Sequence, residues 1–328
     1  MFIDIHGHVY RRPFTGMNKG LLFSSPEQLL KRYEEIGIEK ACLLPLVSPE
    51  VYLPQSNEEI LDIAAAYPDR FIPFCNLDPR AVTNSADAPL GDVLRYYRDL
   101  GCKGIGEVMP NLHFLDPLVQ NLFKCVQDVG WPLIFDGATR IGGAYGLYDD
   151  AGLPQLEKCL QRFPRLTFLG HGPPFWAEIG VLDKPEDRAG YPQYPLRAEG
   201  AVPRLFRKYP NLYGDLSAGS GYNALARDPE HAVRFLHEFQ DRLLFGTDIC
   251  GPEQRVPQAA FLRELLTAKR ISDAVFRKIA RENAIKLLEL DPRRGAPLPA
   301  DAGGRCAARP CHVEAEPSTR QGKEQTSE

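Results

Sequence analysis

The chain has 328 residues, of which 44% are hydrophobic and 25% charged, proportions typical of a soluble globular protein. Lys and Arg number 39 against 43 Asp and Glu, and the formal net charge of -4 provides no basic excess that would favour nucleic acid. No apolar run reaches the roughly 18 residues that suggest a membrane-spanning helix. We therefore expect a small-molecule substrate as partner, with neither nucleic acid nor a membrane.

The cysteines and the first residues bear on where the protein works. None of the 8 cysteines forms a Cys-x-x-Cys pair, and their scatter is unlike a disulfide framework. An apolar strand pattern begins at residue 2, which is unlike a signal peptide. These features predict free thiols and a cytoplasmic location, and they leave open whether the protein forms a homodimer.

Short apolar runs alternate with amphipathic segments along the whole chain. Several runs, such as ACLLP and PLIFD, are almost continuously apolar, as in strands that are covered on both faces. The runs that predict strands are Phe2–His6, Lys40–Pro45, Phe71–Asn76, Lys103–Met109, Pro132–Asp136, Leu166–Gly170, Asn211–Ser217 and Leu243–Asp248.

The segments between these runs have apolar residues at helical spacing. In Pro26–Gly37, for example, Leu29, Tyr33 and Ile36 share one face, and Gly37 is suited to a C-terminal cap. The other predicted helices are Asn57–Tyr67, Leu90–Leu100, Pro117–Val129, Leu153–Phe163, Ala201–Tyr209, His231–Phe239, Ala259–Ala268 and Ser272–Leu290, the last closing the floor of the fold.

Eight strand–helix alternations predict an α/β fold in which parallel strands close into a (β/α)8 TIM barrel. An open doubly wound sheet is the alternative, but no glycine-rich dinucleotide turn supports it. We expect the barrel to occupy residues 1–292. Residues 293–328 contain no aromatic residue and are predicted to be a disordered tail.

The first strand ends in His6-Gly7-His8. Residues two apart on a strand point the same way, so both imidazoles can face one cavity, and Gly7 lets the backbone approach a ligand closely. Paired imidazoles are suited to zinc, iron or manganese. A surface turn that carries two histidines is the alternative if the pair stands alone.

Polar residues at the ends of four other strands indicate that the pair does not stand alone. In a barrel, the carboxyl ends of the strands meet at one rim, where active sites are built. Glu107 lies in the fourth strand, Asp136 ends the fifth, His171 follows the sixth and Asp248 ends the eighth. Any one of them could be a satisfied polar residue at a strand tip, but the set predicts one site.

These motifs resemble the amidohydrolase superfamily, and within it the amidohydrolase-2 branch of decarboxylases and lactone hydrolases. The resemblance covers roughly residues 1 to 290. The matching pieces are His6-Gly7-His8, Gly170-His171-Gly172, Gly246-Thr247-Asp248 and the closing run from Arg281 to Leu288.

The chain departs from that branch at one position, because Asp136 stands where a metal-binding histidine usually ends the fifth strand. Superfamily members with a carboxylate on the fourth strand place it on the metal. The resemblance implies one divalent metal, zinc or alternatively manganese, with Asp136 as a further ligand or a partner of the ligands. The implied ligands are His6, His8, Glu107 and Asp248.

The expected chemistry uses a metal-activated water, whose pKa the metal lowers toward neutrality. Asp248 would accept the proton of this water, and His171 would polarise or protonate the substrate. Arg11 and Arg140 could bind a substrate carboxylate, and Trp176 could contact the substrate, although surface positions are the alternative.

The expected function is a metal-dependent hydrolase acting on a C–O or C–N bond of a small organic substrate, either a carboxylate-bearing compound or a lactone. A non-oxidative decarboxylase (carboxy-lyase) of the same branch is the first alternative. A deoxyribonuclease similar to the TatD family is disfavoured by the net charge and by Asp136. A barrel that has lost its metal and its activity is the last alternative.

Overall fold

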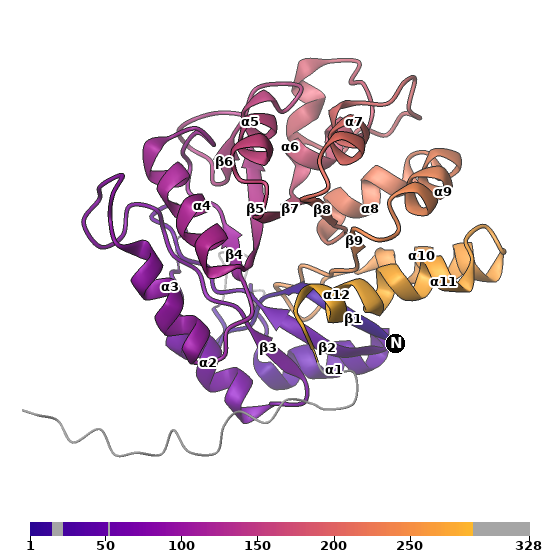
Figure 1. Cartoon of the computed structure of the whole chain (residues 1–328). Coiled ribbons are helices and arrows are strands. Elements are labelled where there is room, and N and C mark those ends of the chain that lie inside the picture. Colours follow the sequence, from indigo (N-terminus) through magenta and orange to yellow (C-terminus); the bar gives the residue numbers. More distant parts are fainter. Residues whose placement is uncertain (15–21, 52, 291–328) are drawn as a thin grey trace, which may run out of the picture. The chain divides into compact units, whose positions relative to one another are not determined.

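The computed structural model describes residues 1–14, 22–51 and 53–290, and the tail predicted at 293–328 lies outside them. Its strands form two parallel sheets (Figure 1). The first sheet contains β1 (Phe2–Gly7), β2 (Ile38–Leu43) and β3 (Phe71–Pro73). The second contains β4 (Ile105–Val108), β5 (Pro132–Ala138), β7 (Thr167–His171), β8 (Leu212–Asp215) and β9 (Leu243–Leu244), with β6 (Leu147–Tyr148) beside β5.

Hydrogen bonds at two seams join these sheets into one ring. Between β3 and β4, Cys75 N donates to Gly104 O at 3.1 Å, and Gly106 N donates to Cys75 O at 3.0 Å. Between β9 and β1, Ile5 N donates to Phe245 O at 3.0 Å and Asp248 N donates to His6 O at 2.7 Å. The predicted closed (β/α)8 barrel is therefore confirmed.

The helices surround the strands in Figure 1. Local sequence explains their ends: in α1, Ser25 and Gln28 form a capping box, and Gly37 closes the helix with a φ of 84°. The helices are α1 (Pro26–Ile36), α2 (Asn57–Ala66), α3 (Leu90–Asp99), α4 (Pro117–Val129), α5 (Pro154–Arg162), α6 (Pro173–Trp176), α7 (Ala201–Lys208), α8 (Ala218–Ala226), α9 (Pro229–Glu238), α10 (Pro257–Thr267), α11 (Asp273–Arg277) and α12 (Asn283–Leu287), with short turns at Ala177–Ile179, Pro185–Ala189 and Lys278–Glu282.

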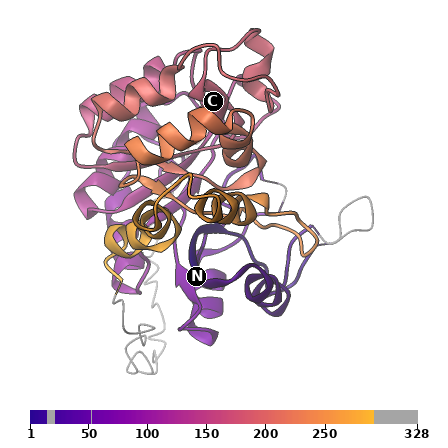
Figure 2. The same ribbon diagram turned by 90° about the vertical axis from the view of Figure 1, so that its right-hand side faces the viewer.

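The interior of the barrel is a separate apolar cluster. Ile3 and Ile5 of β1, Phe74 after β3 and Leu169 of β7 belong to it. Ala284 of α12 and Leu288, directly after α12, also belong to it. Figure 2 shows the C-terminal helices, in orange to yellow, next to the indigo β1. The last helical run therefore closes the floor of the barrel, as predicted, and leaves the carboxyl ends of the strands for the site.

The structure corrects two predicted elements and adds a helix that was not predicted. The last predicted helix is divided by a π-helical turn at Lys278–Glu282, and the eighth predicted strand is regular only at Leu243–Leu244. Helix α8 was not predicted, because the glycines and serine of AGSGYNALA weaken its helical pattern.

The cysteines in the described residues are free. None of the described helices has the length and hydropathy needed to cross a membrane.

Candidate metal centre

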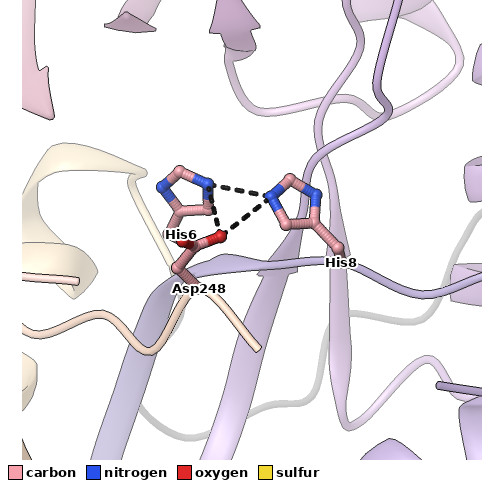
Figure 3. A group of neighbouring side chains, drawn as sticks. All are labelled: His6, His8 and Asp248. Carbon is pink, nitrogen blue, oxygen red and sulfur yellow. Dashed lines mark hydrogen bonds and ion pairs between the residues drawn. The ribbon is translucent and has the colours of Figure 1, made fainter. Parts of the chain in front are cut away.

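His6 in β1 and His8, directly after that strand, form the centre of the site (Figure 3). Their Nε2 atoms are 3.0 Å apart, and both side chains are almost completely buried. The other ring nitrogens are occupied: His6 Nδ1 lies 2.6 Å from Asp215 Oδ2, and His8 Nδ1 lies 2.9 Å from Leu44 O. Because these acceptors fix the proton on Nδ1, both Nε2 lone pairs are available at the same point.

Two carboxylates complete this group. Asp248 Oδ1 lies 3.3 Å from His8 Nε2 and 3.7 Å from His6 Nε2. Glu107 Oε2 lies 3.6 Å from His6 Nε2 and 3.7 Å from His8 Nε2. Tetrahedral ligands about 2 Å from a zinc ion are about 3.3 Å from one another, so the spacing of the two Nε2 atoms and Asp248 Oδ1 fits a divalent metal. Glu107 Oε2 is near enough to both nitrogens to serve as a further ligand.

Asp4 holds the two strands that carry these ligands. Its carboxylate is buried and accepts hydrogen bonds from His6 N and Thr247 N, both at 2.9 Å, from Thr247 Oγ1 at 2.6 Å and from Tyr33 OH at 2.8 Å. Burial raises the pKa of Asp4 to about 6, although these donors act in the opposite direction. Asp4 thereby ties β1 to Thr247, the neighbour of Asp248.

His171 and Asp136 lie on the other side of Glu107. His171 Nε2 is 3.5 Å from Glu107 Oε1, while its Nδ1 faces Ser217 Oγ at 3.0 Å. Asp136 and His171 are Cα partners in the ladder between β5 and β7. Glu107, Asp136 and His171 can offer ligand atoms within 4.8 Å of one another, so they form a second group that could hold a metal. Both roles predicted for Asp136 are compatible with this position.

Asp215 is the residue of the site that sequence reasoning missed. It ends β8, is fully buried, and lies 2.6 Å from His6 Nδ1 and 3.3 Å from His171 Nδ1. One carboxylate therefore orients imidazoles on both sides of the site. The rule of the polar strand tip, applied to the seventh predicted strand Asn211–Ser217, would have found it.

The protonation of the site reflects buried opposite charges. Burial opposes protonation of His6, but the charge of Asp215 and hydrogen bonds to Asp215 and Glu107 hold the pKa of His6 well above its usual value. Burial and the charge of His6 are likewise outweighed at His171, where Asp215 and Glu107 raise the pKa to about 9. In the absence of a cation, protonated imidazoles therefore balance the carboxylates, and a divalent ion would take over that role.

The remaining carboxylates divide into two kinds. Burial would raise the pKa of Glu107 and of Asp248, but neighbouring imidazoles hold both below their usual values. At Asp136, burial and then the charge of Glu107 both act to raise the pKa well above its usual value. Asp136 is thus the carboxylate of the group that binds a proton most readily.

The residues predicted to bind substrate lie away from this centre or are already engaged. Arg11 is exposed and pairs with Asp62 at 2.8 Å, while Arg140 donates to Gly143 O at 2.9 Å. Trp176 is a correction: its indole lies in the hydrophobic core and donates to Asp215 O at 2.8 Å. An apolar ring just after a strand is turned inward by packing, which its sequence position does not reveal.

A closed (β/α)8 barrel with histidines and carboxylates at the carboxyl ends of its strands is the architecture of metal-dependent barrel enzymes. The chain belongs to the amidohydrolase family, because the model of that family, described as "Amidohydrolase", matches residues 3–290. The family is metal-dependent. Membership in it identifies the chain as an enzyme, a metal-dependent hydrolase or decarboxylase. No curated protein matches the sequence.

Solved structures show the same fold. An uncharacterized TIM-barrel protein, Bb4693 from Bordetella bronchiseptica, is 20% identical with a TM-score of 0.59, over 88% of this chain and 98% of that one. An amidohydrolase from Burkholderia multivorans with bound zinc is 15% identical with a TM-score of 0.57, over 89% and 100%. A 2,6-dihydroxybenzoate decarboxylase, complexed with 2,6-dihydroxybenzoate, is 18% identical with a TM-score of 0.52, over 88% and 99%.

Proposed function

We propose that the protein is a metal-dependent hydrolase that cleaves a C–O or C–N bond, such as the ring ester of a lactone, in a small organic substrate. The observation that carries the proposal is the convergence of two imidazole Nε2 atoms, 3.0 Å apart, with Asp248 Oδ1 at 3.3 and 3.7 Å from them. The donor set fits zinc or manganese. The ligands would be His6, His8 and Asp248, with Glu107 as the fourth.

When bound, the metal would supply a Lewis acid that polarises the substrate carbonyl and makes a coordinated water more acidic. Asp248 would accept the proton of the attacking water; its side chain is 23% exposed, so water can reach it. His171 would deliver a proton from Nε2 to the leaving group, while Asp215 and Ser217 hold its Nδ1. Asp215 would hold the imidazole rings of His6 and His171 in their orientations during this transfer.

Decarboxylation is the second candidate. A solved 2,6-dihydroxybenzoate decarboxylase shares the fold, and the same metal and His171 could serve that reaction. Hydrolysis is favoured because the substrate of a decarboxylase is an anion, which needs a positively charged side chain beside it. Among the described residues, the carboxylates of the centre form ion pairs with histidines alone, so no arginine or lysine joins them there as a counter-ion for such a substrate.

The experiment compares the chelator-treated protein with the same protein reloaded with zinc or manganese. Opening of dihydrocoumarin and δ-valerolactone is followed by acid release, and carbon dioxide release is measured with 2,6-dihydroxybenzoate. We expect metal-dependent lactone opening that Asp248→Asn abolishes and that the exposed control Asp62→Asn retains. Metal-dependent carbon dioxide release without lactone opening would assign the decarboxylase, and no metal-dependent turnover of either kind would contradict both candidates.

A further inference from the structure

A small apolar cluster lies directly beside the candidate metal centre. It is separate from the two larger hydrophobic clusters, and its buried members are Tyr10, Phe23, Leu46 and Met109, with Val51, Leu53 and Cys250 packed against them. Its members follow the carboxyl ends of β1, β2, β4 and β9, and three of these strands also carry or precede the proposed metal ligands.

The members of this cluster follow the proposed ligands closely along the chain. Met109 is two residues after Glu107, and Cys250 is two residues after Asp248, with its Sγ 3.9 Å from Asp248 Oδ1. The carbonyl of Leu44, two residues before Leu46, accepts the hydrogen bond that orients His8. The cluster therefore adjoins Glu107, Asp248 and the residue that orients His8, and it meets Asp248 through Cys250.

Two exposed tyrosines come from the loops after β5 and β7. Tyr145 is 56% exposed, and its neighbour Gly146 donates to Met109 O at 2.7 Å and packs so tightly on Gly137 that a Cβ would come within 2.7 Å of the backbone. The loop that carries Tyr145 is therefore fixed at the ends of β4 and β5.

Tyr191 is 49% exposed and lies against the start of α8, where a Cβ at Gly219 would be 3.4 Å from Tyr191 Cζ. The charge of Asp136, together with burial, Glu107 and Asp248, raises the pKa of Tyr145. Burial and then the charges of Asp248 and Asp136 raise the pKa of Tyr191. Both hydroxyls are thus within electrostatic reach of the carboxylates of the centre.

Charge restricts what can lie between the cluster and the two tyrosines. An additional anionic group on the substrate would meet the carboxylates of Glu107 and Asp248, whose pKa values are held below their usual range. The two arginines that the sequence offered as its counter-ions are occupied, one by Asp62 and one by Gly143 O. An uncharged ring meets no such repulsion and gains about 25 cal/mol for each Å² of apolar surface that it buries.

We infer that the substrate has an uncharged ring body, aromatic or of similar width, which lies between the Tyr10–Phe23–Leu46–Met109 cluster and the pair Tyr145 and Tyr191. The inference rests on the proposed function for the position of the reacting carbonyl, and it adds the class of the substrate. The tyrosine hydroxyls donate to polar atoms on the ring, while Leu46 and Met109 contact its apolar face.

Hydroxamates test the inference without requiring turnover, because they bind metals directly. Calorimetry on the zinc-loaded protein would compare benzohydroxamate, acetohydroxamate and 4-carboxybenzohydroxamate, each corrected for its affinity for free zinc ion. We expect benzohydroxamate to bind at least about tenfold more tightly than acetohydroxamate and the carboxylated compound to bind about tenfold more weakly than benzohydroxamate. Equal binding of the first two, or tighter binding of the carboxylated compound, would overturn the inference.

Variants then locate the ring. Tyr145→Phe, Tyr191→Phe and Leu46→Ala should each weaken benzohydroxamate about three- to tenfold and leave acetohydroxamate unchanged. Tyr96→Phe, at a tyrosine of α3 that is also 56% exposed, is the matched control. If all three variants bind benzohydroxamate like wild type, the ring lies elsewhere and the inference is wrong.

The proposed function fails separately. A zinc-loaded protein that prefers benzohydroxamate but opens no lactone contradicts the hydrolase and leaves the ring site standing. A protein that opens lactones without any preference for a ring contradicts the ring site alone. A protein that binds no zinc, which elemental analysis shows directly, contradicts both.

Discussion

The two sides of the site are built differently. On the side of β1 and β9, Asp4 accepts four hydrogen bonds and joins the backbone of His6 to Thr247, while Asp248 N donates to His6 O at 2.7 Å. On the side of β4, β5 and β7, Glu107 is 3.5 to 3.7 Å from three imidazole nitrogens, and Asp136 Oδ1 accepts from the adjacent Gly137 N.

This difference suggests a division of labour. Side chains fixed by several hydrogen bonds on buried strands keep their geometry without a ligand, which suits residues that must retain a metal. Side chains with few fixed partners can adjust when a cation or a substrate arrives. We therefore expect the β1–β9 side to hold the metal, with Glu107 of β4 as the fourth ligand, and His171 on the β5–β7 side to serve the chemistry together with Asp248.

The largest effect is expected where one residue supports both sides. Asp215→Asn replaces a carboxylate that lies 2.6 Å from His6 Nδ1 and 3.3 Å from His171 Nδ1 with an amide that is uncharged. We expect zinc affinity to fall about 10- to 100-fold and turnover at saturating zinc to fall about a hundredfold or more. Competition with a chelating dye and steady-state kinetics would measure the two quantities, and a loss of affinity without a loss of turnover would restrict Asp215 to the metal side.

Disruption of the β1–β9 seam alone should have a smaller effect. Asp4→Asn turns an amide NH2 toward groups that are themselves donors, so at least one buried donor loses its acceptor. We expect the free energy of unfolding to fall by about 1–3 kcal/mol and zinc affinity to fall roughly tenfold. Urea unfolding would measure the first, with the exposed Asp62→Asn as control. An Asp4→Asn protein with unchanged stability would show that the seam does not depend on this network.

The smallest effect on metal is expected at Asp136. The pKa of Asp136 is raised in the folded protein, so the folded state binds a proton more readily than the unfolded state. The stability that this proton contributes to the fold is present below the pKa of the unfolded state and is lost as the pH rises from there through the pKa of the folded state. Asp136→Asn removes that loss. We expect the metal-free variant to be more stable than wild type at pH 8, to show less difference at pH 4, and to keep zinc affinity within about tenfold. Loss of zinc in this variant would make Asp136 a ligand.

The sequence predicted the barrel and the strand tips well, because both depend on local patterns. Polar residues that end apolar strands must meet at one rim, and Glu107, Asp136 and His171 do so. The direction of a side chain beyond a strand is set by packing from distant segments, which explains why Trp176 was misplaced. Tyr145 and Tyr191 lie on loops whose course depends on contacts with β5 and α8, so no local pattern indicated them.

The most direct test of the division between the two sides is the metal content of two histidine variants, measured beside their turnover. His6→Ala removes a nitrogen that lies 3.0 Å from His8 Nε2, and the exposed His237→Ala is the control. We predict that His6→Ala loses metal and activity together. His171→Asn should keep near-normal metal and lose about a hundred- to ten-thousandfold in turnover. If His171→Asn loses metal as completely as His6→Ala, then His171 is itself needed to hold the metal, the roles of Glu107 and Asp136 must be reassigned, and the account is contradicted.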